Sequence, residues 1–226
     1  MKKTAILACQ TLHDEVELTI QQLNCPYPIF WVQENLHDVP RLLRDNIQKE
    51  LDRLEGYEQV LLCFGTCGNA VVGLHTGSFE LIVPRVDDCL SLLMGSMEHR
   101  YAVLEGRAGI FLTAGWLRHE RGLEAEIRRV YSKYDPQKAE RLFHLIYGAF
   151  DSLNVIDTGA YRVETILERV RAISRTLHLT CQVRDGTTCY LKKLFSGPWT
   201  ERQFIRIPPY SQLTAEQAEL DVSNRI

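Results

Sequence analysis

The sequence predicts an α/β protein in which mostly parallel strands form one or two sheets with helices on both faces. Short apolar runs without polar–apolar alternation recur along the chain, and such runs are typical of strands that are buried on both faces. Stretches with helical apolar spacing follow nearly every run, and this alternation is typical of a parallel sheet. The pattern is compatible with two related Rossmann-like halves.

Eight apolar runs are expected to be strands. The first is TAILAC, the third is EQVLLCF, and the last is a short FIRI just before a double proline. In order along the chain they span 4–9, 28–33, 58–64, 79–84, 108–116, 152–159, 178–185 and 204–207. Ligands of such sheets bind beyond the carboxyl ends of the strands. The residues that follow each run are therefore the first candidates for a functional site.

Helices are expected between these runs. Their apolar spacing places them at 11–23, 39–54, 67–75, 87–96, 116–132, 136–149, 161–174 and 188–197. Asp38 followed by Pro40 is a typical helix start. Asp87 or Asp88 is expected to cap the helix that begins there, because an aspartate side chain accepts hydrogen bonds from the first free N–H groups of a helix.

An internal similarity suggests two lobes. CLSLLMGS begins at Cys89 and CYLKKLFSG begins at Cys189, and each follows an apolar run and an acidic turn. A duplication with lobes at about 1–100 and 101–209 would explain this offset, although chance similarity between short strand–helix units explains it equally well. The polar residues 210–226 are expected to form a peripheral tail.

Composition favours a globular cytoplasmic protein. Of the 226 residues, 45% are hydrophobic and 24% are charged, and the net charge is -3. This balance argues against a nucleic-acid or membrane-surface binder, because no basic excess is present to neutralise phosphates. The apolar run near the N-terminus is too short for a signal peptide. No run reaches the roughly 18 apolar residues of a membrane helix.

Three of the seven cysteines follow predicted strands. Cys9 ends the first strand, Cys67 lies in a turn after the third, and Cys89 lies in the first helical turn after the fourth. We expect their thiols to converge and to ligate a metal ion or an iron–sulfur cluster. A helix start would also lower the thiol pKa and favour the thiolate. The alternative is that all are buried apolar residues, which we expect for Cys63 inside its strand.

Further candidates flank these cysteines. Arg85 is expected to hold a carboxylate or phosphate, and Asp88 to act as an acid–base group or as a helix cap. Trp116 is expected either to give a flat wall for a planar ligand or cofactor or to pack as a core tryptophan. In FGTCGN, glycines permit close approach of an anion or cofactor. The cofactor-binding residues expected in this turn are Gly65, Gly68 and Asn69.

The segments ILAC, FGTCGNAVVGL, PRVDDCLSLLMGS, FLTAGW and VIDTG, with the closing SGPW, together resemble an uncharacterised prokaryotic family of unknown function. The resemblance covers about residues 4–209. Genes of that family often neighbour those of corrinoid-dependent methyltransferases, which implies a role in corrinoid or one-carbon metabolism. Relatives often carry a histidine in place of Asp87, which argues against a mechanism that needs an imidazole there. The family's motif positions here are Cys9, Gly65, Cys67, Gly68, Arg85, Asp88, Cys89, Gly95 and Trp116.

Three hypotheses follow. The first is a metal- or cluster-binding protein that uses Cys9, Cys67 and Cys89 and handles a corrinoid, a methyl group or a small substrate between the lobes. The second is a metal-free enzyme in which Cys67 is the nucleophile and Arg85 holds a small anionic substrate. The third is a non-catalytic accessory protein for a corrinoid methyltransferase or its corrinoid protein.

Overall fold

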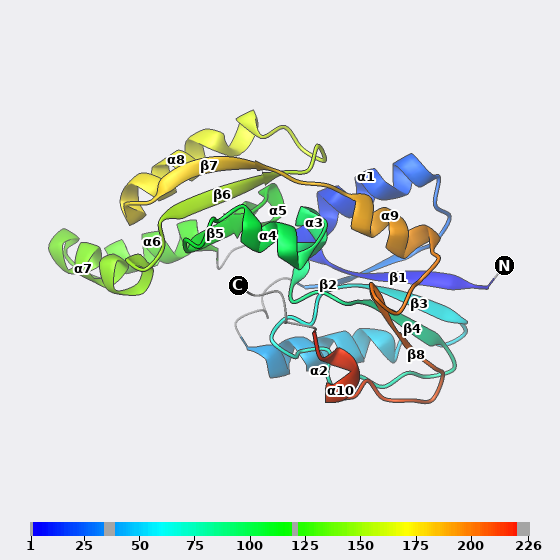
Figure 1. Ribbon diagram of the computed structural model, residues 1–226. Coiled ribbons are helices and arrows are strands. Elements are labelled where there is room, and N and C mark those ends of the chain that lie inside the picture. Colours follow the sequence, from blue (N-terminus) through cyan, green and yellow to red (C-terminus); the bar gives the residue numbers. More distant parts are fainter. Residues whose placement is uncertain (1, 34–38, 119–121, 221–226) are drawn as a thin grey trace.

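The computed structural model describes residues 2–33, 39–118 and 122–220, and it contains two sheets (Figure 1). The larger sheet has the order β2-β1-β3-β4-β8, and its first four strands are parallel while β8 is antiparallel to β4. The smaller sheet has the order β5-β6-β7 and is fully parallel. The predicted α/β class is confirmed.

All eight predicted strands are present in the described part of the chain. Their ends differ from the expected ends mainly where a strand gives way to a turn, most of all after β5. The bounds are β1 Thr4–Cys9, β2 Ile29–Val32, β3 Gln59–Cys63, β4 Glu80–Pro84, β5 Gly109–Leu112, β6 Ser152–Asp157, β7 Thr180–Asp185 and β8 Phe204–Ile207.

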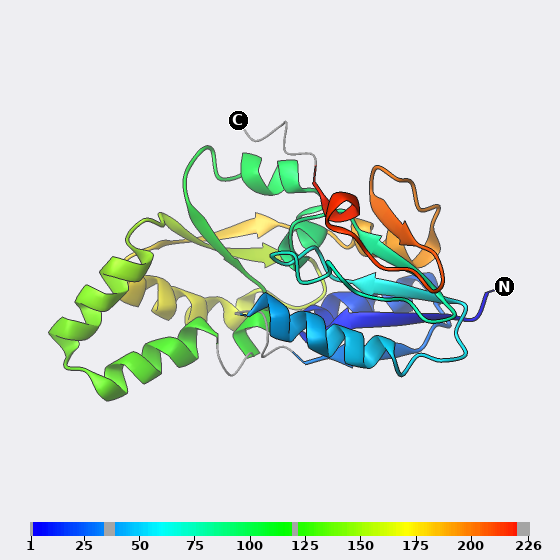
Figure 2. The same ribbon diagram turned by 90° about the horizontal axis from the view of Figure 1, so that it is seen from below.

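Helices cover both faces of the larger sheet, which explains the continuous apolar runs. The helices α1 (His13–Leu23) and α9 (Cys189–Ser196) lie on one face (Figure 1). On the other face lies α2 (Pro40–Leu51), which Figure 2 shows in front of the strands. Every residue of β1 and β3 is consequently buried.

The smaller sheet carries its own core. The helices α6 (Leu123–Lys133) and α7 (Pro136–Tyr147) form a pair at the far end of this lobe, and α8 (Glu164–Leu177) packs on β6 and β7 (Figures 1 and 2). Residues from these helices and from β6 form a second hydrophobic cluster, separate from that of the larger sheet. The protein therefore has two lobes: the first lobe is built around the larger sheet, and the second lobe is built around the smaller sheet.

The lobes are not consecutive halves of the chain. Two short helices, α3 (Cys89–Met94) and α4 (Met97–Ala102), lead from β4 to β5, and after β7 the chain returns to the first lobe. Within residues 189–207, β8 joins the larger sheet and α9 packs in the core around that sheet. This segment therefore belongs to the first lobe and not to the second. The two segments that resemble each other, α3 and α9, thus pack in the same core and contact each other.

The segment after the double proline packs against the first lobe, whereas its polarity suggested a peripheral tail. Leu213 is buried, its N–H donates to the carbonyl of Leu74, and its own carbonyl accepts from Gly73. Thr214 and Gln217 then form a capping box on the short helix α10 (Ala215–Ala218). This segment lies beside the loops at the carboxyl ends of β3 and β4.

Two helix predictions need correction, and one further helix was not expected. Residues 67–75 form turns rather than a helix, because Cys67, Gly68 and Asn69 all have positive φ angles, of 46°, 65° and 67°. The stretch expected at 116–132 divides into α5 (Ala114–Arg118) and α6, with 119–121 outside the described residues. The helix α4 was not expected. Asp38 lies outside the described residues, and the residue before α2 is Val39.

No described helix is both long enough and apolar enough to span a membrane.

Candidate functional site

The loops after β3 and β4 are joined by backbone hydrogen bonds. The N–H groups of Thr66 and Cys67 donate to the carbonyls of Val86 and Asp87, at 2.8 and 2.7 Å. The loops approach so closely that a Cβ atom on Gly65 would lie 2.5 Å from the Cα of Asp88. Gly65 is therefore required for backbone packing. This pairing places Cys67 next to the start of α3.

Three thiols meet at this place. The sulfur atoms of Cys67 and Cys89 lie 3.9 Å apart. Cys9 comes from the end of β1; its thiol hydrogen-bonds to Cys89 and lies 2.9 Å from the hydroxyl of Thr11. Cys9 and Cys89 are buried, whereas Cys67 is partly exposed. The structure thus brings together the three cysteines that were expected to converge.

The environment of Cys89 favours the neutral thiol. Hydrogen bonds to Cys67 and Cys9, together with burial, raise the pKa of Cys89 well above its ordinary value. The expected lowering of a thiol pKa by a helix start is not observed at Cys89. No helix begins at Cys67, although one was expected there. Cys63 is fully buried in β3, and burial raises its pKa as well, as expected for a core residue.

The spacing of two thiols suits a metal ion, although the full ligand set is not in place. With metal–sulfur bonds of about 2.3 Å and tetrahedral angles, two ligand sulfurs lie about 3.8 Å apart. The 3.9 Å between Cys67 and Cys89 is close to this value. Among the described residues, no group of three or more His, Cys, Asp and Glu side chains is arranged to hold a metal ion. The thiol of Cys9 is instead engaged with Thr11.

An ion-pair cluster fixes the start of α3. Asp88 caps the helix by accepting from the N–H groups of Leu90 and Ser91, at 2.9 and 3.1 Å. Its other oxygen accepts from Arg100 of α4 at 2.6 Å. Asp87 accepts from Arg100 at 3.4 Å and from the hydroxyl of Tyr101 at 2.7 Å. The cluster holds Cys89 in place and carries a net charge of one negative unit.

Arg100 was not anticipated, since no local motif marks it. It lies in a short helix between the lobes and meets Asp88 only because α3 and α4 pack together.

A cavity of about 310 Å³ opens beside the thiols, between the lobes. We call it the thiol cavity; its lining residues are Cys67, Gly68, Asp87, Asp88, Cys89, Leu90 and Trp116. Trp116 comes from α5 of the second lobe, and the other residues come from the first. The lobes touch here so closely that a Cβ atom on Gly115 would lie 1.9 Å from the carbonyl oxygen of Thr11. Gly115 thus lets α5 bring Trp116 to the cavity.

The remaining predicted cofactor residue lies in a neighbouring hollow. Asn69 lines a cavity of about 620 Å³ that also includes Gly68 and Asp87 and is closed on one side by α10. Gly68 lines both hollows. The turn from Cys67 to Asn69 therefore separates the thiol cavity from the C-terminal segment.

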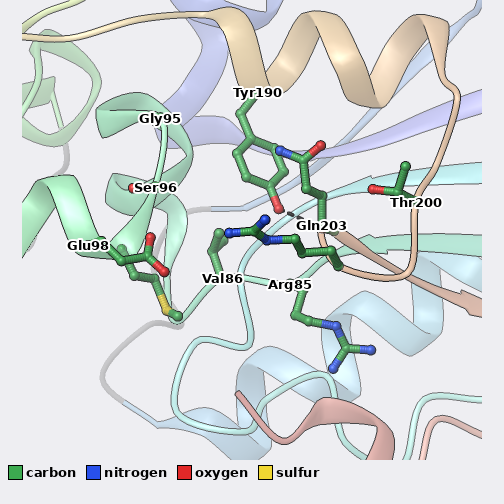
Figure 3. A pocket seen from close by; sticks show the side chains of 10 residues that line it. Arg85, Val86, Gly95, Ser96, Glu98, Tyr190, Thr200 and Gln203 are labelled. Carbon is green, nitrogen blue, oxygen red and sulfur yellow. Dashed lines mark hydrogen bonds between the residues drawn. The ribbon is translucent and has the colours of Figure 1, made fainter. Parts of the chain in front are cut away.

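Arg85 lies outside the thiol cavity. Figure 3 shows it in a different cavity, of about 360 Å³, together with Glu98, Tyr190 and Thr200. Its guanidinium donates to three main-chain carbonyls, those of Glu201, Gln217 and Glu219, at 3.0 to 3.1 Å. These bonds attach the C-terminal segment to the loop after β4. Arg85 is therefore occupied with structural hydrogen bonds rather than facing the thiols.

The chain was compared with known proteins. Residues 31–195 match a family described as Protein of unknown function (DUF1638). The chain belongs to this family. The matched region includes Cys67, Cys89 and Trp116 but begins after Cys9. No curated protein and no solved structure matches the chain.

Glu15 is a buried ionisable group that the sequence analysis did not identify. It lies on α1 and is fully buried, and one carboxyl oxygen accepts from the hydroxyl of Thr158 at 3.0 Å. Its Oε2 has no hydrogen-bond partner among the described residues. Burial raises the pKa of Glu15 to about 7. Because Thr158 follows β6, this carboxyl lies at the junction of the lobes.

Two other cysteines and one histidine lie away from the thiol cavity. Cys189 is exposed at the start of α9, and Cys181 lies in β7. His75 exchanges backbone hydrogen bonds with the side chain of Gln48. None of these three residues lines the thiol cavity.

Proposed function

We propose that the protein binds a thiophilic metal ion or an iron–sulfur cluster through Cys9, Cys67 and Cys89. The observation that carries this proposal is the convergence of three thiols from separate segments, two of them 3.9 Å apart, beside an accessible cavity. Thiolates favour soft and borderline metals. Three protein ligands would leave a tetrahedral ion one further position for a ligand, and the partly exposed Cys67 lines the accessible cavity.

The charge around the thiols favours a cation over an anionic substrate. Asp87 and Asp88 line the cavity, and Arg100 balances only one of them. Arg85, the residue expected to hold an anion, is bonded to main-chain carbonyls elsewhere. The hypothesis of a metal-free cysteine enzyme acting on a small anion therefore has less support than metal binding.

Metal binding would change the protonation of the site. The pKa of Cys89 is raised, so its thiol is protonated at neutral pH, and a ligating thiol must release its proton. Cys9 would exchange its contact with Thr11 for a bond to the metal. Asp88 would keep Cys89 in position throughout, because its carboxylate is fixed by the helix cap and by Arg100.

The test is anaerobic purification followed by elemental analysis, sulfide analysis and an absorption spectrum. We expect stoichiometric metal or cluster in the wild-type protein and its loss in Cys67→Ser. Cys189→Ser is the matched control, since Cys189 also begins a helix of the first lobe but is exposed. A wild-type protein without metal, iron or sulfide, or a Cys67→Ser variant with unchanged content, would contradict the proposal.

A role in corrinoid or methyl-transfer metabolism stays a prediction that rests on the resemblance alone. We propose it as the setting in which the metal site works, with a corrinoid methyltransferase as the partner. Titration of the purified protein with a cobalamin, followed by its visible spectrum, tests the corrinoid. Pull-down of a methyltransferase without any turnover by the protein itself would instead favour the accessory role.

A further inference from the structure

Cys67 and Cys89 form a close pair of thiols with unequal access to solvent. Their sulfur atoms lie 3.9 Å apart, so no other atom fits between them. Both residues line the thiol cavity, but Cys67 is partly exposed whereas Cys89 is only 2% exposed. A reagent in the cavity therefore reaches Cys67 first, and the sulfur of Cys89 lies directly behind it.

The backbone holds Cys67 against Cys89 in an uncommon conformation. Cys67 has a φ angle of 46°, and residues with a side chain rarely adopt a positive φ. The N–H of Cys67 donates to the carbonyl of Asp87 at 2.7 Å, two residues before Cys89. Backbone strain of this kind is concentrated at functional sites. Here it keeps an accessible thiol next to a buried one.

The two thiols need little movement to form a disulfide. Bonded sulfur atoms lie about 2.05 Å apart, so the gap of 3.9 Å has to close by about 1.9 Å. Rotation about the Cα–Cβ bond of Cys67 can supply this distance, because its thiol borders a cavity rather than packed side chains. Cys89 stays in place, since Asp88 caps the helix that begins there.

We propose that Cys67 and Cys89 are a redox-active pair that is oxidised by a small uncharged disulfide. The sulfur of Cys67 attacks one sulfur of this reagent and forms a mixed disulfide, and one small thiol leaves with the proton of Cys67. The sulfur of Cys89 then attacks that of Cys67, and a second small thiol leaves with the proton of Cys89. The protein thiols lose two electrons, and these reduce the reagent to two thiols.

Charge and position select this reagent and this pair. Asp87 and Asp88 line the cavity, and Arg100 balances only one of them, so an anionic disulfide is repelled. Cys9 also contacts Cys89, but it is fully buried and out of reach of a reagent. Cys189 is exposed but lies outside the thiol cavity.

The disulfide and the proposed metal are alternative states of the same thiols. Oxidation removes two of the three proposed ligands, because a metal ligand has to be a thiolate. Only this consequence rests on the proposed function. Formation of the disulfide itself needs no metal.

The test uses the full chain with Cys189→Ser, reduced and treated with a chelator, so that neither the exposed thiol nor a metal interferes. The probe is 2-hydroxyethyl disulfide, and free thiols are alkylated at successive times before peptide mass spectrometry. We expect a cross-linked peptide that joins Cys67 to Cys89. In Cys89→Ser the mixed disulfide on Cys67 should persist about tenfold longer or more, because the fast second step between neighbouring thiols is lost.

Cys9→Ser is the matched control, because it removes a buried neighbour of Cys89 but neither reacting thiol. It should leave the cross-link intact. If Cys89→Ser does not fold, Cys67→Ser tests the pair from the exposed side, and Cys89 should then stay reduced. An unreactive Cys67, a mixed disulfide that persists beside an intact Cys89, or a Cys9–Cys89 bond instead overturns the proposal. Since the protein is free of metal, none of these results bears on the proposed metal site.

Discussion

Cys89 and Cys189 begin helices with similar sequences, yet their surroundings are opposite. Both lie in the first lobe, and their helices α3 and α9 contact each other. Cys89 is 2% exposed and is hydrogen-bonded to two other thiols, whereas Cys189 is exposed. The difference comes from position: α3 follows β4 of the larger sheet directly, at the edge where β1 and β3 also end.

The caps of the two helices differ in the same way. The side chain of Asp88 accepts from two N–H groups of α3 and pairs with Arg100. Thr188 makes no side-chain cap, and the N–H of Cys189 bonds to Thr187 instead. A cysteine at a helix start is therefore not a site by itself. The neighbouring strand ends decide whether it meets other thiols.

The largest expected difference between the two cysteines is in metal affinity. Cys89→Ala should weaken metal binding about 100-fold or more, because it removes a direct ligand, and loss of even an outer partner costs 10–100-fold. Cys189→Ala should leave the affinity unchanged. Competition with a chelator of known affinity measures both. Equal affinities for the two variants would remove Cys89 from the ligand set.

The pH dependence of metal affinity sharpens the comparison. Each thiol that must lose a proton on ligation strengthens the apparent affinity about tenfold per pH unit, as long as the pH is below its pKa. The pKa of Cys89 is raised, so this dependence should extend through neutral pH. The slope of log affinity against pH, which equals the number of protons released on binding, should fall by about one in Cys89→Ala and stay unchanged in Cys189→Ala. A slope of zero in the wild type would contradict ligation by protonated thiols.

Thiol labelling compares the two residues without a metal. Reaction with a thiol reagent needs access and the thiolate, so Cys189 should react about tenfold or more faster than Cys89 in the folded protein. Peptide mass spectrometry after short labelling gives both rates. In denaturant the rates should become similar. Equal rates in the folded protein would mean that Cys89 is not protected by its burial.

The smallest expected effect concerns the caps. Asp88→Ala should lower the free energy of unfolding by about 1 kcal/mol or more, because it removes a helix cap and leaves Arg100 with a weaker partner. Thr188→Ala should change it by only a few tenths, since no side-chain cap is lost. Urea unfolding followed by circular dichroism measures both. A similar loss of unfolding free energy in the two variants would show that the Asp88 cap does not stabilise the protein more than Thr188 does.

The strands and the convergence of the cysteines could be predicted because both follow from local patterns. A strand buried on both faces reads as a continuous apolar run, and the ends of β1 and β3 meet because neighbouring strands are parallel. A cap by Asp87 or Asp88 could also be predicted from the sequence, and Asp88 forms it. The return of the chain to the first lobe could not be predicted, because nothing local in the α9 sequence shows that this helix packs on the larger sheet.

The misplaced residues depend on contacts between distant segments. The turn at Cys67 was taken for a helix because non-glycine residues rarely adopt positive φ, and Cys67 and Asn69 both do. Arg85 was assigned to a ligand because its main-chain partners lie more than a hundred residues away. Glu15 was missed since its burial depends on Thr158 of the other lobe.

The buried carboxyl of Glu15 gives folding stability a pH dependence opposite in direction to the one expected for metal affinity at the thiols. Its pKa is raised from 4.5 to about 7, so between these values the folded chain keeps a proton that the unfolded chain releases. Unfolding free energy therefore falls as the pH rises through this window, by about 3 kcal/mol in total. Mildly acidic solution thus favours the folded chain, in which Glu15 is buried at the junction of the lobes, whereas rising pH would favour the proposed ligation of a metal by the thiols.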